Sequence, residues 1–188
     1  MQHFFVLTGA MGSGKSTVCQ YLESGSLNVV AEPARQILME QRCFDGRGIP
    51  SHDPQLFTDL MLSRALYAYN QNRHTGGSVL FDRGVPDMIA YAELFRLDTS
   101  AFERAARVYR YNPTVFVMQD WAEIYTTDSE RTMTYEQARD FGRSVRDVYR
   151  RLDYDLVEVP RVSVEDRGGL LLPSRLKCDY EFFFVPRG

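Results

Sequence analysis

The most chemically distinctive stretch of this sequence is a glycine-rich turn that leads into a lysine and two hydroxyl side chains. It consists of Gly9, Ala10, Met11, Gly12, Ser13, Gly14, Lys15, Ser16 and Thr17, and its first eight residues match G-x-x-x-x-G-K-[ST] in full. Glycines let a backbone wrap closely around an anion, so that successive N–H groups point at it. The pattern therefore predicts a loop that holds the phosphates of a nucleotide, and we call residues 9–17 the phosphate loop.

Each polar side chain of the phosphate loop is suited to a different task. We expect Lys15 to reach the β- and γ-phosphates of ATP and Ser16 to ligate Mg²⁺. Thr17 is expected to touch the α-phosphate or to cap the turn. The helix that follows would add the partial positive charge of its N-terminus. ATP and Mg²⁺ are therefore the expected cofactors.

Two acidic residues stand at the ends of apolar runs, each with an arginine close behind. Asp82 is followed directly by Arg83, and Glu32 is followed three residues later by Arg35. A carboxylate at such a position can hold hydrated Mg²⁺ or accept the proton of a hydroxyl group. Either Asp82 or Glu32 could be the base; we favour Asp82 in the magnesium shell and Glu32 as the base, with Arg83 and Arg35 orienting an acceptor near loop 43–52. Ordinary turn and helix-capping roles are the alternatives.

A polar segment of about residues 120–134 is expected to form a small lid. It carries the only tryptophan of the chain and several charged residues, among them Asp120, Glu123, Asp128 and Arg131. A lid that excludes water favours transfer to an acceptor over hydrolysis. Arg131 is the best candidate for neutralising transition-state charge, and pairing with a nearby acid is the alternative. Arg139, Arg143, Arg146 and Arg150 follow at helical spacing, which indicates a solvated face or one further lid arginine.

The elements that must position these residues alternate along the chain. Apolar runs predict five strands, at about 3–9, 27–32, 76–84, 113–119 and 154–160. Helical spacing and capping residues predict helices at about 16–24, 33–41, 54–68, 86–96, 100–111, 134–152 and 163–172. Such alternation predicts an α/β fold with a parallel sheet covered on both faces. Ligands bind such sheets at the carboxyl ends of the strands.

Composition narrows the class of protein. The chain has 188 residues, 44% of them hydrophobic, and a net charge of -3, which favours one soluble domain over 1–188 and argues against a nucleic-acid binder. No apolar run approaches the roughly 18 residues of a membrane span. Three separated cysteines and the absence of a basic leader favour the cytoplasm. The tail of about 177–188 is expected to be a sixth strand, a homodimer contact or a docking segment.

Five blocks together resemble a known family: GAMGSGKST, AEPARQIL, VLFDRGVPDMIAY, WAEIYTTDSER and LVEVPRVSVEDR. They are similar to the single-domain predicted ATPases/kinases grouped with the ribosylnicotinamide kinase domain, among the nucleoside and nucleotide kinase-like P-loop proteins. The resemblance covers about residues 3–172. It implies a P-loop NTPase three-layer sandwich whose five-stranded sheet has the order 2-3-1-4-5.

The same resemblance implies roles by position. Glu32 and Pro33 resemble the Glu-Pro of deoxynucleoside and thymidylate kinases, where the acceptor binds, and Glu32 with Arg35 resembles the Glu-x-x-Arg of ribosylnicotinamide kinase. Asp82 and Arg83 resemble an acidic-Arg pair after strand three, and Arg131 falls where lid arginines lie. Ribosylnicotinamide kinases differ after strand three, which argues against nicotinamide riboside as the acceptor.

Taken together, these features favour an ATP-dependent phosphotransferase that acts on a hydroxyl group of a small metabolite, with nucleosides among the candidates. The alternative is a nucleotide-hydrolysing switch or ATPase that works with a protein partner. No N-K-x-D or LSGGQ-like segment is present, which disfavours a GTPase switch and a transporter ATPase.

Overall fold

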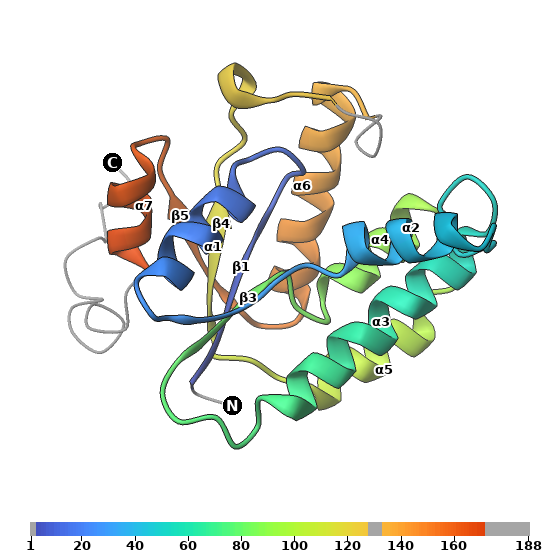
Figure 1. The fold of residues 1–188 in the computed structure, drawn as a ribbon, viewed down its shortest axis with the longest axis horizontal. Helices are drawn as coiled ribbons and strands as arrows, with labels where there is room; N and C mark the ends of the chain where they lie inside the picture. The colour runs from blue at the N-terminus through green and yellow to red at the C-terminus, as the bar shows by residue number, and fades with distance from the viewer. Residues whose placement is uncertain (1–2, 128–132, 172–188) are drawn as a thin grey trace.

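A five-stranded parallel sheet forms the middle layer of the computed structural model, which describes residues 3–127 and 133–171 (Figure 1). The strands are β1 (Phe4–Gly9), β2 (Asn28–Val30), β3 (Val79–Asp82), β4 (Thr114–Met118) and β5 (Asp155–Val159). Their order is β2-β3-β1-β4-β5, with every pairing parallel. The expected α/β fold class and strand order are confirmed. The edge strand β2 is shorter than predicted and ends before Glu32.

Helices cover both faces of the sheet. They are α1 (Lys15–Ser24), α2 (Ala34–Cys43), α3 (Pro54–Gln71), α4 (Asp87–Leu94), α5 (Ser100–Val108), α6 (Tyr135–Arg151) and α7 (Val164–Leu170), with a short 3-10 turn η1 (Ala122–Ile124). Successive residues of β1 point to opposite faces. Phe4 and Val6 join one buried apolar cluster with α3 to α6, and Phe5 and Leu7 join another with α1 and α7. Two cores on the two sides of one sheet make the three-layer sandwich.

Several helices begin at the residues that the sequence indicates. Asp53 accepts a hydrogen bond from the backbone N–H of Leu56 at the start of α3. Thr134 and Gln137 form a complete capping box at the start of α6. Ser163 caps α7 by accepting from the N–H of Asp166. These caps satisfy N–H groups that the helices leave without partners.

Strand register brings three distant segments to one edge of the sheet. Leu7, which precedes the phosphate loop, pairs with Asp82, and the N–H of Arg83 continues the ladder to the Leu7 carbonyl at 3.0 Å. On the other side of β3, Phe81 pairs with Val30, two residues before Glu32. Because the strands are parallel, the phosphate loop, Asp82 and Glu32 all follow the carboxyl ends of neighbouring strands.

Three of the sequence predictions concern residues outside the described ranges. Asp128 and Arg131 of the expected lid and the tail of 177–188 are not among the described residues. Within the described residues, no helix combines the length and apolar character needed to cross a bilayer.

Candidate active site

The backbone of the phosphate loop adopts conformations that only glycine takes easily. Gly9, Gly12 and Gly14 have φ angles of +130°, +74° and +84°. A Cβ atom at Gly9 would also lie 2.8 Å from the carbonyl oxygen of Met118, so β4 packs directly against the start of the loop. The Ser13 hydroxyl donates to the Ala10 carbonyl at 2.9 Å and closes the turn. The glycines of the motif are therefore required by geometry.

Lys15 opens α1 and is buried beneath the loop. Its Nζ donates to the carbonyl oxygen of Ala10 at 2.8 Å and to that of Gly9 at 3.4 Å. Burial, together with the nearby charge of Arg83, lowers the pKa of Lys15 to about 8. A phosphate beside this amine would favour its charged form. Ser16 and Thr17, in the same first turn of α1, are exposed.

Asp82 is a buried carboxylate at the end of β3, and its Oδ1 makes no hydrogen bond. Burial raises the pKa of Asp82 to about 6, and the charge of Glu32 adds to this while Lys15 and Arg83 oppose it. Mg²⁺ in nucleotide sites takes one or two protein oxygens together with phosphate and water oxygens. An unpartnered buried carboxylate and an exposed hydroxyl of the phosphate loop are oxygen donors of the kind that this set requires. The described residues contain no cluster of three His, Cys, Asp or Glu that could hold a metal by itself.

Arg83 ties the Glu32 carboxylate to the phosphate loop. Its side chain is only 2% exposed, and its Nε donates to Glu32 Oε1 at 2.8 Å. Its Nη1 donates to the Gly9 carbonyl at 3.1 Å and to Asp87 Oδ1 at 2.9 Å. The guanidinium also lies 5.3 Å from the centre of the Phe141 ring. The structure thus places Arg83 behind Glu32, as a bridge between Glu32 and the phosphate loop.

Glu32 is a half-buried carboxylate held by donors on two sides. In addition to Arg83, the Tyr91 hydroxyl donates to Glu32 Oε1 at 2.9 Å. Burial by itself raises the pKa of Glu32, but the charges of Arg83 and Lys15 and the hydrogen bonds from Tyr91 and Arg83 outweigh it and lower the pKa. Glu32 is therefore ionised at neutral pH and stays fixed in place.

Asp87 is a fully buried carboxylate that sequence reasoning did not single out. It accepts hydrogen bonds from the Thr8 hydroxyl at 2.5 Å, the Tyr149 hydroxyl at 2.6 Å and the Gly84 N–H at 2.9 Å, in addition to Arg83. It therefore joins β1, the turn after β3 and α6 in one network. The available signal was an acidic residue in the first turn of the helix predicted after Arg83, although Arg83 itself lies in the turn before α4.

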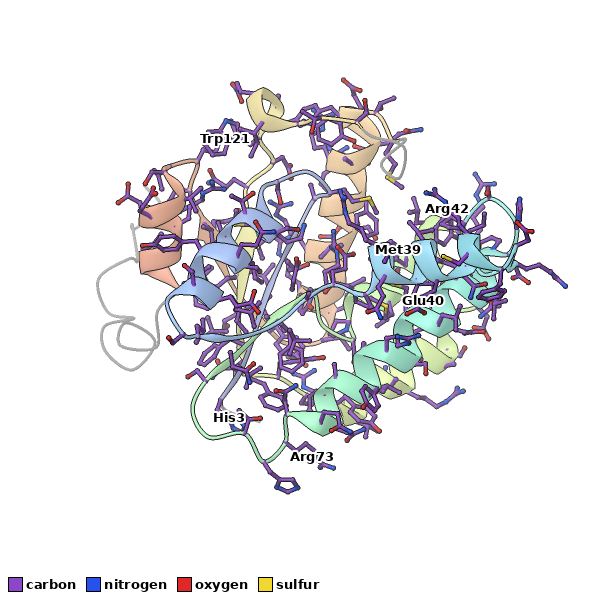
Figure 2. The ribbon with its side chains drawn as sticks, viewed as in Figure 1. His3, Met39, Glu40, Arg42, Arg73 and Trp121 are labelled. Atoms are coloured by element: carbon purple, nitrogen blue, oxygen red, sulfur yellow. The ribbon has the colours of Figure 1, made fainter. Side chains whose placement is uncertain are left out.

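A cleft of about 710 Å³ opens beside Glu32 and Asp82. Its walls come from α2 and α3, and its lining includes Val30, Ala31, Pro33, Arg35, Gln36, Met39, Arg64, Ala65, Tyr67, Ala68, Phe81, Arg83, Gly84, Met88 and Tyr111. Loop 43–52, which the sequence had suggested as a wall, does not line this cleft; α3 takes that place. Glu40 on α2, labelled in Figure 2, accepts a hydrogen bond from Arg64 on α3 at 2.7 Å, which links the two walls.

The α6 arginines divide into two groups. Arg139, Arg143 and Arg150 pair with exposed Asp140 or Asp147 on their own helix, as the solvated-face interpretation predicts. Arg146 differs because its side chain is half-buried and bonds to Asp120, Glu158 and the Met118 carbonyl. It therefore connects α6 to the end of β4 and to the first residues of the expected lid.

Comparisons with known proteins agree with this architecture. The profile of a family described as an AAA domain matches residues 4–167. The deoxyadenosine kinase from M. mycoides with bound dATP superposes with a TM-score of 0.65 at 14% identity, over 93% of this chain and 100% of that one. A shikimate kinase from Acinetobacter baumannii in complex with shikimate superposes with a TM-score of 0.57 at 19% identity, over 94% of both chains. A NadR protein in complex with NR superposes with a TM-score of 0.58 at 19% identity, over 84% of this chain and 45% of that one.

At these identities the structural similarity establishes the fold, which is that of the P-loop kinases. None of the curated proteins matches the sequence.

Proposed function

The chain belongs to the AAA domain family, whose profile matches residues 4–167, and we propose that it is an ATP-dependent phosphotransferase acting on a hydroxyl group of a small metabolite. One observation carries this proposal. Asp82 lies between the phosphate loop and a separate cleft that also exposes Glu32. A donor site and an acceptor site thus share one edge of the sheet, which is the arrangement that transfer between two small molecules requires.

On the donor side, the N–H groups of the phosphate loop hold the phosphates and Lys15 leaves the loop carbonyls for the β- and γ-phosphate oxygens. Ser16 and Asp82 would hold Mg²⁺. When bound, the metal neutralises charge on the β- and γ-phosphate oxygens. Arg131, carried by the lid segment, is proposed to add charge at the γ-phosphate.

On the acceptor side, Glu32 is proposed as the base. The acceptor hydroxyl oxygen attacks the γ-phosphorus in line, the bond from phosphorus to the bridging oxygen of ADP breaks, and the hydroxyl proton passes to the Glu32 carboxylate. Its lowered pKa keeps Glu32 ionised and ready to accept. Arg83 fixes the orientation of this carboxylate, and Arg35 in the cleft wall orients the acceptor.

The dimensions and lining of the cleft support a small acceptor. Its volume of about 710 Å³ lies in the usual range for pockets that enclose metabolites. Apolar side chains make up most of its lining, and Glu32, Asp82 and Arg83 are among its polar residues. The neighbours of known structure include kinases of deoxyadenosine and of shikimate, two hydroxylated small molecules, and a kinase of thymidylate, a small nucleotide. We place the reaction in the cytoplasm, in keeping with free Cys19 and Cys43.

A partner-stimulated ATPase is the second candidate. Met39 and Tyr67, on the cleft walls, are 59% and 64% exposed, and Phe44 at the end of α2 is equally open. An exposed apolar rim of this kind favours contact with a macromolecule.

The deciding experiment measures ADP formation from ATP, alone and with a panel of nucleosides and hydroxylated metabolites. A phosphotransferase hydrolyses ATP slowly, and one compound accelerates ADP formation sharply and gains a phosphate by mass spectrometry. Steady hydrolysis that no small molecule changes would instead support the ATPase. As a control, Lys15→Ala should abolish turnover while its circular dichroism spectrum stays native; retained activity would refute the donor site.

A further inference from the structure

Arg167 on α7 is a buried cation placed directly against the phosphate loop. Only 4% of the residue is exposed. A Cβ atom added at Gly14 would lie 2.9 Å from its Nη1, so the guanidinium rests on the loop at the residue before Lys15. Its Nε donates to the Ser163 carbonyl at 3.3 Å, whereas Nη1 makes no hydrogen bond. A buried charged donor without a partner is costly, so its presence calls for a ligand.

Two contacts fix this guanidinium in place. Gly168 allows α7 to approach α1 closely, because a Cβ there would lie 2.5 Å from the Tyr21 ring. The guanidinium also lies 5.3 Å from the centre of the Trp121 ring, beyond the end of β4 (Figure 2). A cation over an indole face keeps its N–H groups in the plane parallel to the ring and free for hydrogen bonding at its edge. Arg167 is therefore oriented before any ligand binds.

The side of the sheet on which Arg167 lies indicates which part of a ligand it meets. Asp82 and Glu32 follow β3 and β2, on one side of β1, so the γ-phosphate must point that way. The nucleoside end of the donor must then run toward the opposite side of β1, over β4 and β5. Trp121 follows β4 and Arg167 follows β5. The guanidinium therefore borders the path of the donor between the phosphate loop and the nucleoside.

We propose that Arg167 binds the donor nucleotide through its Nη1, at the α-phosphate where the phosphate chain leaves the loop near Gly14, with Trp121 holding the guanidinium in position. This inference rests on the proposed function, because it takes ATP or ADP as the ligand. It adds to the phosphate loop a contact from α7 that Trp121, at the start of the expected lid, holds in position. Burial lowers the pKa of Arg167, with Glu165 opposing the effect, and an anionic phosphate would supply the missing countercharge.

The position of Trp121 provides a direct optical test. It is the only tryptophan of the chain, so intrinsic emission reports on the ring beside Arg167. ADP with Mg²⁺ is titrated into the wild type and three variants, with isothermal calorimetry as the second measure of affinity. Arg167→Met keeps an unbranched chain against Trp121 and removes the charge. Arg167→Lys keeps the charge without the planar guanidinium, and Arg161→Met removes an exposed charge from the same β5–α7 connection.

We expect ADP to change the emission of the wild type. Arg167→Met should weaken ADP binding about tenfold to a hundredfold, the usual value of a charge-assisted hydrogen bond to a phosphate. The affinity of Arg167→Lys for ADP should lie between those of the wild type and Arg167→Met. Arg161→Met should bind ADP within about twofold of the wild type. Thermal unfolding of each ligand-free variant shows whether it is folded. If Arg167→Met is not folded, the ADP affinity of Arg167→Lys decides the result.

Three results would overturn the inference: unchanged or tighter ADP binding by Arg167→Met, an equal loss in Arg161→Met, or calorimetric binding without any change in emission. Each leaves the proposed function standing if a hydroxylated acceptor is phosphorylated. Conversely, a protein that binds ADP through Arg167 but phosphorylates no acceptor supports the inference and refutes the phosphotransferase. A wild type that binds no ADP refutes both.

Discussion

Two buried carboxylates five residues apart, Asp82 and Asp87, have opposite surroundings. Asp87 is paired with Arg83 and accepts hydrogen bonds from Thr8, Tyr149 and Gly84, whereas Asp82 has an oxygen without a partner. Removing a buried charge that has partners destabilises the protein, because its partners lose their bonds. Removing a buried charge that has no partner stabilises the protein, because burying it was unfavourable. The two residues should therefore respond to the same substitution with opposite signs.

Asp82→Asn is predicted to stabilise the free protein at pH 7. The pKa of Asp82 is raised from 3.8 to about 6, so the folded state binds its proton more tightly than the unfolded state. The free energy of unfolding thus falls as the pH rises from about 4 to about 6. Above pH 6 the ionised Asp82 carboxylate lowers it by up to about 3 kcal/mol. Urea denaturation of Asp82→Asn at pH 7 and pH 4 should show the gain only at pH 7.

The same variant should lose about a hundredfold or more in turnover, since the proposed magnesium shell loses its carboxylate. Asp59→Asn, which changes an exposed carboxylate on α3, should alter stability by less than about 0.5 kcal/mol. A stability gain of Asp82→Asn that is equal at both pH values would contradict the assigned protonation.

Asp87→Asn should instead destabilise the protein by about 3 kcal/mol, because it leaves the buried charge of Arg83 without its partner. Tyr149→Phe, which removes one neutral donor from the same carboxylate, should cost about 1 kcal/mol. Urea denaturation measures both. With Arg83 loosened, Glu32 loses its orientation, so kcat should fall more than the affinity for ADP. Equal stability of the two variants would show that Asp87 does not hold Arg83.

At the scale of elements, α6 supports the phosphate loop directly. A Cβ atom at Gly142 would lie 3.0 Å from the Ala10 Cβ and 3.2 Å from the Ala10 backbone nitrogen. The same helix donates the Tyr149 hydroxyl to Asp87 and begins just after the lid segment, at the capping box of Thr134. The position of α6 therefore affects both the phosphate loop and the Asp87 carboxylate that holds Arg83.

Gly142→Ala is predicted to weaken ADP binding by about fivefold to tenfold. Alanine gains about 1 kcal/mol of helix propensity over glycine, but here the added methyl group presses on the loop backbone and shifts it. Calorimetric titration with ADP measures the effect. Arg139→Ala, on the exposed face of α6, provides the control and should bind normally. Normal binding by Gly142→Ala would show that the loop can yield without loss.

At the scale of the whole molecule, ligand binding should couple to stability. Both halves of the site lie at one edge of a sheet whose two apolar cores flank it. A ligand on the phosphate loop contacts residues that follow β1 and β3 and the start of α1, so it links several elements of the fold. Ligands that bind only the native state raise its stability by mass action.

ADP at a hundred times its dissociation constant should add about 2.7 kcal/mol, which for a chain of this size raises Tm by about 5 to 10 °C. Differential scanning fluorimetry measures the shift. Excess chelator should remove most of this rise in Tm. Ser16 and Asp82 alone supply too few ligands to retain the metal, so the chelator should take it from the nucleotide site. A shift unchanged by chelator would show that nucleotide binding does not depend on the metal.

The sequence alone determined the local features of this protein. The glycine pattern of the phosphate loop follows from backbone sterics, and the caps at Asp53, Thr134 and Ser163 follow from short-range hydrogen bonding. The alternation of apolar runs and helical spacing gave the elements and the three layers, since periodicity is local information. The strand order came from the resemblance to the P-loop kinase-like proteins, and the sheet confirms it.

Tertiary structure alone decided which of these residues meet. It placed Arg83 behind Glu32, built the cleft wall from α3, and brought Asp87, Tyr149 and Thr8 into one buried network. It also laid Arg167 on Gly14, two segments that lie more than 150 residues apart in the numbering of the chain. Such contacts depend on strand register and helix packing, which relate distant residues through the whole fold. No pattern within a short window carries that information.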